Sequence, residues 1–323
     1  MENNKKRIII EMSSLFQRSL RKKRICMYPN CTCEAINSHL LQKHGIVDLI
    51  AENGHVYELN KYDFIRNNIN GIGFHKIGIN DAISYHLFCN THDSLVFKSI
   101  EDSFVDFDNY RNQLLFAYRA ICTDIRKKES DIDFCQFVLQ SNSISDKERN
   151  QMASKIKGCR MNINDYLFFK SELEKELEQS QNLFVFHHYT YPPLKIYAST
   201  AFSYIEYDSY EDKVEDSKCW ECCFLNIIPR DKQTEILIGY HKDYTNNRLI
   251  NLTEILGNLD CEQLGTELTN IFVFHADDWG MSPSLYDKIT INQKDLFCKL
   301  YTLSLMRHEA SLWTDFNFFK VEL

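Results

Sequence analysis

Hydrophobic residues recur at steps of three and four through the middle of the chain. This spacing places side chains on one face of a helix, so residues 101–183 are predicted to be helical. Ser145 and Glu148 have the spacing of a capping box, in which each side chain satisfies the other's backbone donor. The first stripe comprises Phe104, Phe107, Tyr110, Leu114, Tyr118, Ile121 and Ile125, and the second comprises Ile163, Tyr166, Phe169, Leu173 and Leu177.

The pattern changes to short apolar runs from about residue 184. Runs rich in aromatic and β-branched residues predict strands, and the segment 229–233 predicts a hairpin loop. Ser282 and Pro283 predict a helix start, with proline at the first helical position. We therefore expect residues 184–323 to form a mixed, largely antiparallel α+β domain. The predicted strands are 183–188, 196–205, 222–228, 235–240 and 270–274, and Leu296, Leu300 and Leu303 predict a closing helix.

Residues 25–100 differ in composition from the rest of the chain. They contain five of the ten glycines and six of the eleven histidines, which favours short elements joined by turns. Asn53-Gly54 predicts a turn before a strand at 55–59. The predicted fold class is α+β, in four segments: an N-terminal arm (1–24), a zinc-binding segment (25–100), a helical region (101–183) and the C-terminal domain (184–323).

Twelve cysteines stand out in this chain, which has only 15 glycines and prolines together. The first residues lack the apolar core of a signal peptide, and no apolar run approaches the roughly 18 residues needed to cross a bilayer. We therefore expect a cytoplasmic protein without a membrane partner. In that reducing setting cysteines are thiols or metal ligands rather than disulfides.

Positive charge gathers at the N-terminus of an otherwise acidic chain. The net charge is −8, yet residues 1–24 contain eight cations and two acids. Such an arm can contact nucleic-acid phosphates, and Arg21, Lys22, Lys23 and Arg24 are the candidate residues. The alternative is a solvated, frayed terminus.

The strongest chemical signal is two pairs of soft ligands. Cys26 and Cys31 form a C-x4-C pair with Cys33 close by, and Cys89 and His92 form a C-x2-H pair. Two such pairs suit a tetrahedral zinc ion, whose four protein ligands would make the site structural. Cys26, Cys31, Cys89 and His92 are the predicted ligands, with Cys33 the alternative to Cys31. The competing interpretation is that these cysteines are simply buried thiols.

A Ser38-His39-x-x-Gln42-Lys43 stretch lies between the pairs, and Phe88-Cys89-x-x-His92-Asp93 closes the segment. With the first cysteine pair, these motifs resemble HNH-like treble-clef zinc proteins, especially uncharacterised bacterial members thought to act in phage defence. The resemblance covers roughly residues 25–100 and extends faintly into the helix at 116–119.

The resemblance implies a catalytic arrangement. His39 occupies the place of the general base that activates water against a phosphate, and Asn80 or Asn90 the middle place. The family usually places a histidine after the second metal pair, where this chain has Asp93, an oxygen ligand suited to Mg²⁺ or Mn²⁺. Ser38 stands where an aspartate commonly precedes the first histidine. His39 and Asp93 are therefore the candidate catalytic residues, and a structural role for His39 is the alternative.

Two other clusters carry weaker signals. Cys219 and Cys222 have ligand spacing but no second pair nearby. His275 and Asp277, at the end of a predicted strand, have the residue types of an acid–base pair, and a turn is the simpler interpretation.

Two hypotheses for function follow. The first is a zinc-containing HNH-like protein that binds or cleaves nucleic acid, as a metal-dependent nuclease in antiviral defence. The second is a non-catalytic module, structured by zinc, that recognises a protein partner through its C-terminal domain.

Overall fold

The computed structural model describes residues 2–43, 45–60, 72–102, 104–141, 144–204, 219–307 and 313–320. Within these ranges, no helix is long and apolar enough to span a membrane. The helices are α1 (Glu2–Leu20), α2 (Asn90–Val96), α3 (Tyr110–Leu139), α4 (Asp146–Gln179), α6 (Asn247–Ile255), α7 (Cys261–Phe274), α8 (Pro283–Lys288) and α9 (Ile291–Arg307). Short 3₁₀ turns cover Val47–Leu49, Lys98–Ile100 and Leu256–Asn258.

The strands form two antiparallel sheets in the described part of the chain. The larger sheet has seven strands in the order β3-β2-β9-β6-β7-β8-β5, and the smaller pairs β1 with β4. The α+β class predicted from the sequence is confirmed. The strands are β1 (Asn37–His39), β2 (His55–Asn60), β3 (Gly73–Gly78), β4 (Ser84–His86), β5 (Phe184–Tyr191), β6 (Ile196–Phe202), β7 (Cys223–Pro229), β8 (Thr234–His241) and β9 (Trp279–Met281).

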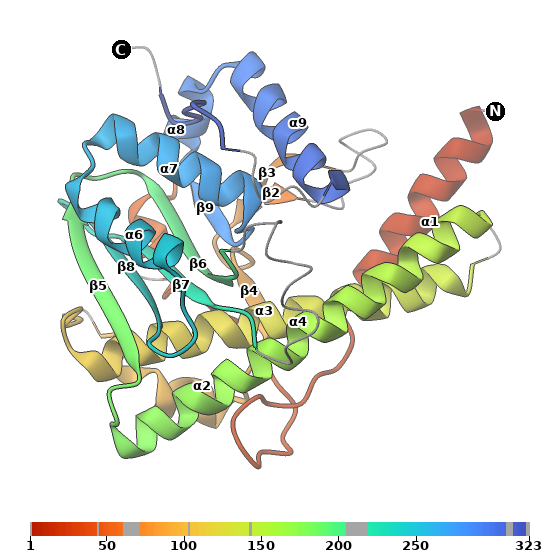
Figure 1. Cartoon of the computed structure of the whole chain (residues 1–323). Coiled ribbons are helices and arrows are strands. Elements are labelled where there is room, and N and C mark those ends of the chain that lie inside the picture. Colours follow the sequence, from red (N-terminus) through yellow and green to blue (C-terminus); the bar gives the residue numbers. More distant parts are fainter. Residues whose placement is uncertain are drawn as a thin grey trace.

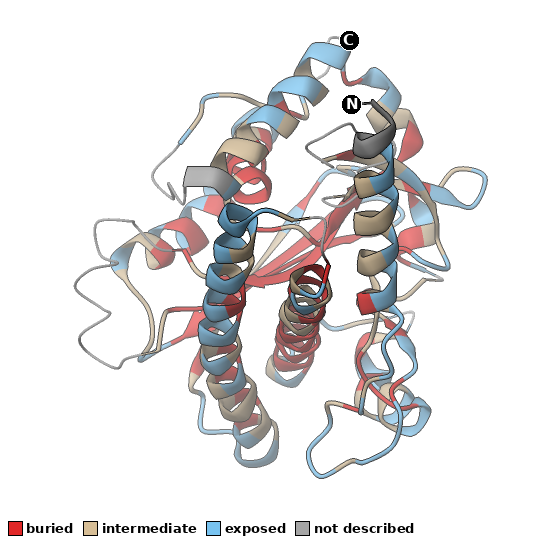
Figure 2. Cartoon of the chain, turned by 90° about the vertical axis from the view of Figure 1, so that its right-hand side faces the viewer, coloured by how far each residue is buried: buried red, intermediate tan, exposed pale blue. Residues whose placement is uncertain are grey.

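Helices cover both faces of the large sheet (Figure 1). On β7, Phe224 and Ile228 belong to the core shared with α3 and α4, whereas Leu225 and Ile227 belong to the core shared with α6 and α7. Successive strand residues point to opposite faces, so a strand that is covered on both sides carries apolar residues on both of its faces. Strands β6, β7, β8 and β9 are buried along their whole length and form the buried centre of the sheet in Figure 2, whereas the edge strands β3 and β5 are partly exposed.

Local sequence signals place several element ends as predicted. Asn53 and Gly54 both have positive φ and turn the chain into β2. Arg230 N–H donates to Gln233 O, which closes the hairpin between β7 and β8. The Ser145–Glu148 capping box starts α4, and the Ser282 side chain caps α8.

Two predicted elements differ from the structure. Helix α3 begins only at Tyr110, because the Asn109 side chain accepts the Asn112 N–H as an N-cap, so Phe104 and Phe107 precede the helix. Phe104 is 92% exposed. The predicted strand at 270–274 is the last turn of α7, which a capping box of Asp260 and Gln263 initiates. The apolar run reflects the helix's deep burial rather than strand structure.

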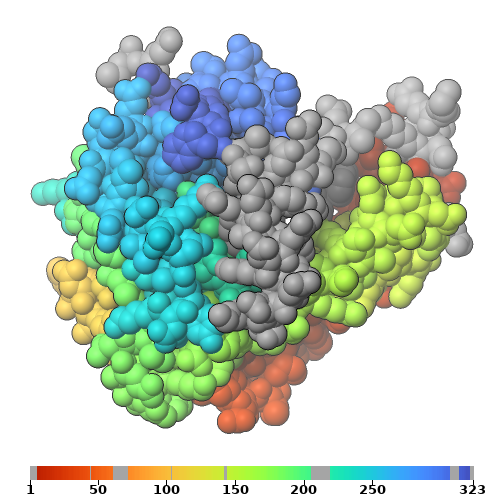
Figure 3. Space-filling view, viewed as in Figure 1, coloured from red at the N-terminus to blue at the C-terminus, as the bar shows by residue number. Residues whose placement is uncertain are grey.

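Residues 2–20 of the predicted arm form helix α1, which lies against α3. Met12, Leu15 and Phe16 pack on the C-terminal half of α3, and the rings of Phe16 and Phe134 meet edge to face at 5.7 Å. In the space-filling view, red atoms of α1 show at the right beside the yellow-green atoms of α4, and the C-terminal helices lie in blue at the top (Figure 3). The helix therefore belongs to the folded body.

The large sheet joins segments from both ends of the sequence. The hairpin of β2 and β3 lies in the predicted zinc-binding segment, yet β2 pairs with β9, where Tyr57 lies opposite Met281. Strand β9 in turn pairs with β6. The sequence boundaries predicted near residues 100 and 184 thus fall between parts of one sheet.

Candidate metal centre

The first predicted ligand pair lies in a tight turn before β1. Asn30 adopts a positive φ, and Cys31 N–H donates to Tyr28 O at 3.2 Å. Cys26 N–H donates to Cys33 O at 2.9 Å, which closes the turn. This geometry directs the sulfurs of Cys26 and Cys31 to the same side.

The second pair comes from the start of α2. Cys89 is the N-cap of this helix and His92 lies in its first turn. Residues three apart on a helix share a face, so Cys89 and His92 approach the turn of Cys26 and Cys31 together.

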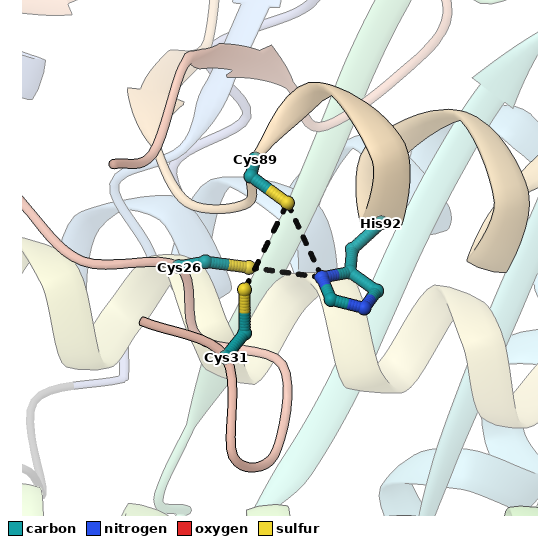
Figure 4. Close-up of side chains that lie close together, drawn as sticks. All are labelled: Cys26, Cys31, Cys89 and His92. Atoms are coloured by element: carbon teal, nitrogen blue, oxygen red, sulfur yellow. Dashed lines mark hydrogen bonds between the residues drawn. The ribbon is translucent and has the colours of Figure 1, made fainter. Parts of the chain in front are cut away.

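The four side chains point toward one another (Figure 4). Their ligand atoms all lie within 4.8 Å of one another. Cys26 Sγ is 3.5 Å from His92 Nδ1, Cys89 Sγ is 3.2 Å from the same nitrogen, and the sulfurs of Cys31 and Cys89 are 3.9 Å apart. Cys26, Cys31, Cys89 and His92 therefore lie close enough together to bind a metal ion.

The surroundings shift the pKa values of the Cys26 and Cys89 thiols in opposite directions. Burial raises the pKa of Cys26 to about 11, whereas the backbone N–H of His92 lowers the pKa of Cys89. Tyr28 stacks on the His92 ring with 4.0 Å between centroids, which helps to hold Nδ1 toward the sulfurs. Metal binding requires thiolates, so a bound cation would have to overcome the raised pKa of Cys26.

Cys33, the alternative ligand, is exposed and lies outside the group of four. The Cys31 thiol beside it raises the pKa of Cys33. The geometry thus favours Cys31 as the fourth ligand.

The two candidate catalytic residues lie near enough to each other for the charge of His39 to act on Asp93. His39 ends β1, and its Nε2 is 3.1 Å from the carbonyl oxygen of Asn80. Asp93 follows His92 on α2, hydrogen-bonds to Ser38, and has a buried Oδ1 without a partner among the described residues. Burial raises the pKa of Asp93, and the charges of Arg119 and His39 oppose this.

Ion pairs occupy most of the basic cluster at the end of α1. Lys22 lies 2.6 Å from Asp133, Lys23 lies 2.9 Å from Glu34, and Arg24 lies 2.7 Å from Asp133. Arg21 has no carboxylate partner in the described part of the chain. Three of the four predicted phosphate contacts are therefore engaged with acids of the same chain.

The weaker clusters are not assembled as sites in the described residues. Cys219 Sγ lies 3.3 Å from Asp165 Oδ1, and Cys222 is buried beside it without joining any metal-binding group found there. The ring of His275 stacks on Phe202, and burial lowers its pKa to about 3. Asp277 instead accepts a hydrogen bond from Tyr301, so His275 and Asp277 do not form an acid–base pair.

The structure brings together a second group of charged residues that was not predicted from the sequence. Lys127 Nζ lies 2.5 Å from Asp278, 3.3 Å from Asp124 and 3.4 Å from Asp277. Glu58 on β2 is nearby, and burial raises its pKa to about 7, with the charge of Asp278 adding to this. The lysine and its three aspartates have no recognisable spacing along the chain, so the sequence does not predict that they meet. Within this group, only the adjacent Asp277 and Asp278 could be noticed in the sequence.

No family model matches the chain, and no curated protein or solved structure is significantly similar to it.

Proposed function

We propose that Cys26, Cys31, Cys89 and His92 hold a structural zinc ion. A tetrahedral zinc site has edges of about 3.8 Å between two sulfurs and about 3.5 Å between sulfur and nitrogen. The separations of 3.9, 3.5 and 3.2 Å lie near these values. This agreement carries the proposal, and four protein ligands leave no open position for substrate.

The order of the elements supports an HNH-like treble clef around this ion. The turn of Cys26 and Cys31 is followed by the paired strands β1 and β4, and then by α2 with Cys89 and His92. The long segment between β1 and β4 contributes the β2–β3 hairpin to the large sheet.

We further propose that this segment acts on nucleic acid, with His39 as a general base for phosphodiester hydrolysis. Donation from Nε2–H to the Asn80 carbonyl would fix the tautomer and leave Nδ1 as the acceptor of a proton from water. The unpartnered Oδ1 of Asp93 is a hard oxygen ligand for Mg²⁺ or Mn²⁺, which would supply charge stabilisation at the phosphate.

A nicking assay on supercoiled DNA, and on RNA, with Mg²⁺ or Mn²⁺ tests this chemistry. We expect His39→Ala to lower the rate by about 10²-fold or more, the usual contribution of a general base. His55→Ala is the matched control, because His55 is an exposed histidine at the start of β2. Equal rates in the wild type and His39→Ala, or no activity in either, would reject the nuclease.

The proposed role in phage defence rests on the resemblance to bacterial HNH-like proteins. Cells that express the wild type should lower the efficiency of phage plating, and cells that express His39→Ala should not. Protection by neither protein would contradict this part of the proposal.

The ion pairs of Lys22, Lys23 and Arg24 favour a second candidate, a non-catalytic recognition module. In that case the zinc would serve the fold, and the C-terminal half would bind a protein partner. The full chain must be used to test it, because deleting residues 184–323 would remove the strand that pairs with β2. Phage protection retained in His39→Ala, without nicking by either protein, would favour this candidate.

A further inference from the structure

A cavity of about 630 Å³ lies apart from the metal centre. Residues of α1, α3, β2, β3 and β4 line it, together with the loop before β9, and these elements can be located in Figure 1. Its size is that of a pocket for a small organic ligand.

Glu58 offers this cavity an unused hydrogen-bond acceptor. Its Oε1 accepts hydrogen bonds from Tyr197 OH at 2.6 Å and from Ile83 N–H at 2.9 Å. Its Oε2 has no partner among the described residues, and the side chain lines the cavity. Two protein donors thus fix the carboxylate in place and leave one oxygen for a ligand.

The charged group beside Glu58 is already satisfied. Lys127 lies within 2.5 Å of Asp278, whose other oxygen accepts a hydrogen bond from Tyr85 OH at 2.8 Å. Lys127, Asp278 and Tyr85 therefore form a rigid part of the cavity lining, and their polar groups are not needed to bind the ligand.

Positive charge lines another part of the cavity. Arg21 and Lys128 border it, and neither has a carboxylate partner within the ranges that the structure describes. Arg24 and Arg126 line the cavity too, but each is paired with a carboxylate, so Arg21 and Lys128 are the lining cations left for an anionic ligand. An anionic group would be favoured in this part of the cavity.

We propose that this cavity binds a mononucleotide, with its phosphate near Arg21 and Lys128 and the amino group of its base donating to Glu58 Oε2. A phosphate alone would leave the Glu58 acceptor unmatched, and an uncharged base would leave the cations unmatched. Tyr85 and His86 supply aromatic rings on the lining for contact with the base.

Calorimetry on the full chain at pH 8 separates these contributions. AMP is the probe, adenosine removes the phosphate, and purine riboside 5′-monophosphate removes the amino group. We expect each deletion to weaken binding by about tenfold or more, as for loss of a hydrogen bond to a charged group. Equal affinity for all three compounds would overturn the proposal, as would no binding of AMP, CMP or GMP at millimolar concentration.

Variants test the two contacts separately. Glu58→Gln keeps Oε1 for Tyr197 and Ile83 and replaces Oε2 with a donor. It should weaken AMP about tenfold and leave purine riboside 5′-monophosphate unchanged. Arg21→Ala/Lys128→Ala should weaken AMP but not adenosine.

The exposed pair of Lys23 and Glu34 supplies controls outside the cavity. Lys23→Ala and Glu34→Gln should bind AMP like the wild type. Unchanged affinity in both cavity variants would overturn the proposal. If Glu58→Gln fails to fold, the Arg21→Ala/Lys128→Ala comparison of AMP with adenosine decides alone.

Discussion

Lys127 lies against three carboxylates among the residues that the structure describes. Its side chain is 13% exposed, and its ammonium group lies against Asp124, Asp277 and Asp278. Breaking a buried pair leaves uncompensated charge, which is more harmful than loss of the attraction itself.

We therefore expect Lys127→Met to lower the free energy of unfolding by about 3–5 kcal/mol. Urea denaturation at pH 7.5 measures it. Lys23→Met is the control, because the exposed Lys23–Glu34 pair should contribute less than about 1 kcal/mol. Equal effects of the two substitutions would contradict this account of the buried network.

Glu58 should make stability depend on pH. Burial raises its folded pKa from 4.5 to about 7, so the folded state binds the proton more tightly than the unfolded state. That contribution is complete below pH 4.5 and is lost as the pH rises to 7. It corresponds to about 3 kcal/mol.

Urea unfolding of the wild type and Glu58→Gln between pH 4.5 and 7.5 tests this. As the pH rises, the free energy of unfolding of Glu58→Gln should increase relative to that of the wild type. The free energy of unfolding of Glu34→Gln should change with pH as the wild type does. A constant difference across this range would show that Glu58 titrates normally.

The candidate metal ligands could be chosen from the sequence because each pair is close along the chain. Cys26 and Cys31 share one turn, and Cys89 and His92 share one helical turn. Lys127 and Asp278 are 151 residues apart, so no local spacing connects them. Their contact depends on the sheet that places β9 beside β2 and β6.

Helix α4 shows how far local signals determine an element. Its Ser145 side chain accepts the Glu148 N–H, and Glu148 reaches back to the Ser145 N–H. These bonds satisfy donors that a helix start otherwise leaves free.

We expect Ser145→Ala to destabilise the protein by about 1 kcal/mol. Ser154→Ala is a matched control in the exposed interior of the same helix, where alanine is the better helix former. Chemical denaturation measures both. A loss in Ser154→Ala as large as that in Ser145→Ala would contradict the capping role.

The caps of α4 and α8 and the β7–β8 hairpin could be predicted because their signals are local. Helix α7 was missed because its last residues are apolar on all sides, a pattern that buried helices and strands share. The apolar spacing predicts too early a start for α3, because Phe104 matches the spacing although it is exposed and precedes the helix.

At the scale of the whole molecule, a single hydrophobic core contains residues from several of the segments predicted from the sequence. One hydrophobic core joins Cys26 and Cys89 to Tyr118 of α3 and to Tyr197 of β6. Composition separated residues 25–100 from the C-terminal half, yet strand pairing over such distances leaves no local trace in a sequence. Disturbance of the metal centre should therefore reach the large sheet.

We expect a strong chelator to lower the melting temperature of the whole chain by several degrees, because the proposed zinc ion would bind only the folded state. A single transition, followed by circular dichroism and tyrosine fluorescence, is expected. Two separate transitions, with the large sheet unaffected, would show that the metal-binding segment folds independently.

The central claim is that Cys26, Cys31, Cys89 and His92 hold one zinc ion, and metal content tests it most directly. Elemental analysis of the purified chain should find one zinc per molecule in the wild type and in Cys33→Ser. Cys31→Ser, two residues away, should lose zinc to a chelator at a much lower concentration. A folded wild-type chain without zinc, or equal zinc loss from Cys33→Ser and Cys31→Ser, would contradict the proposed centre.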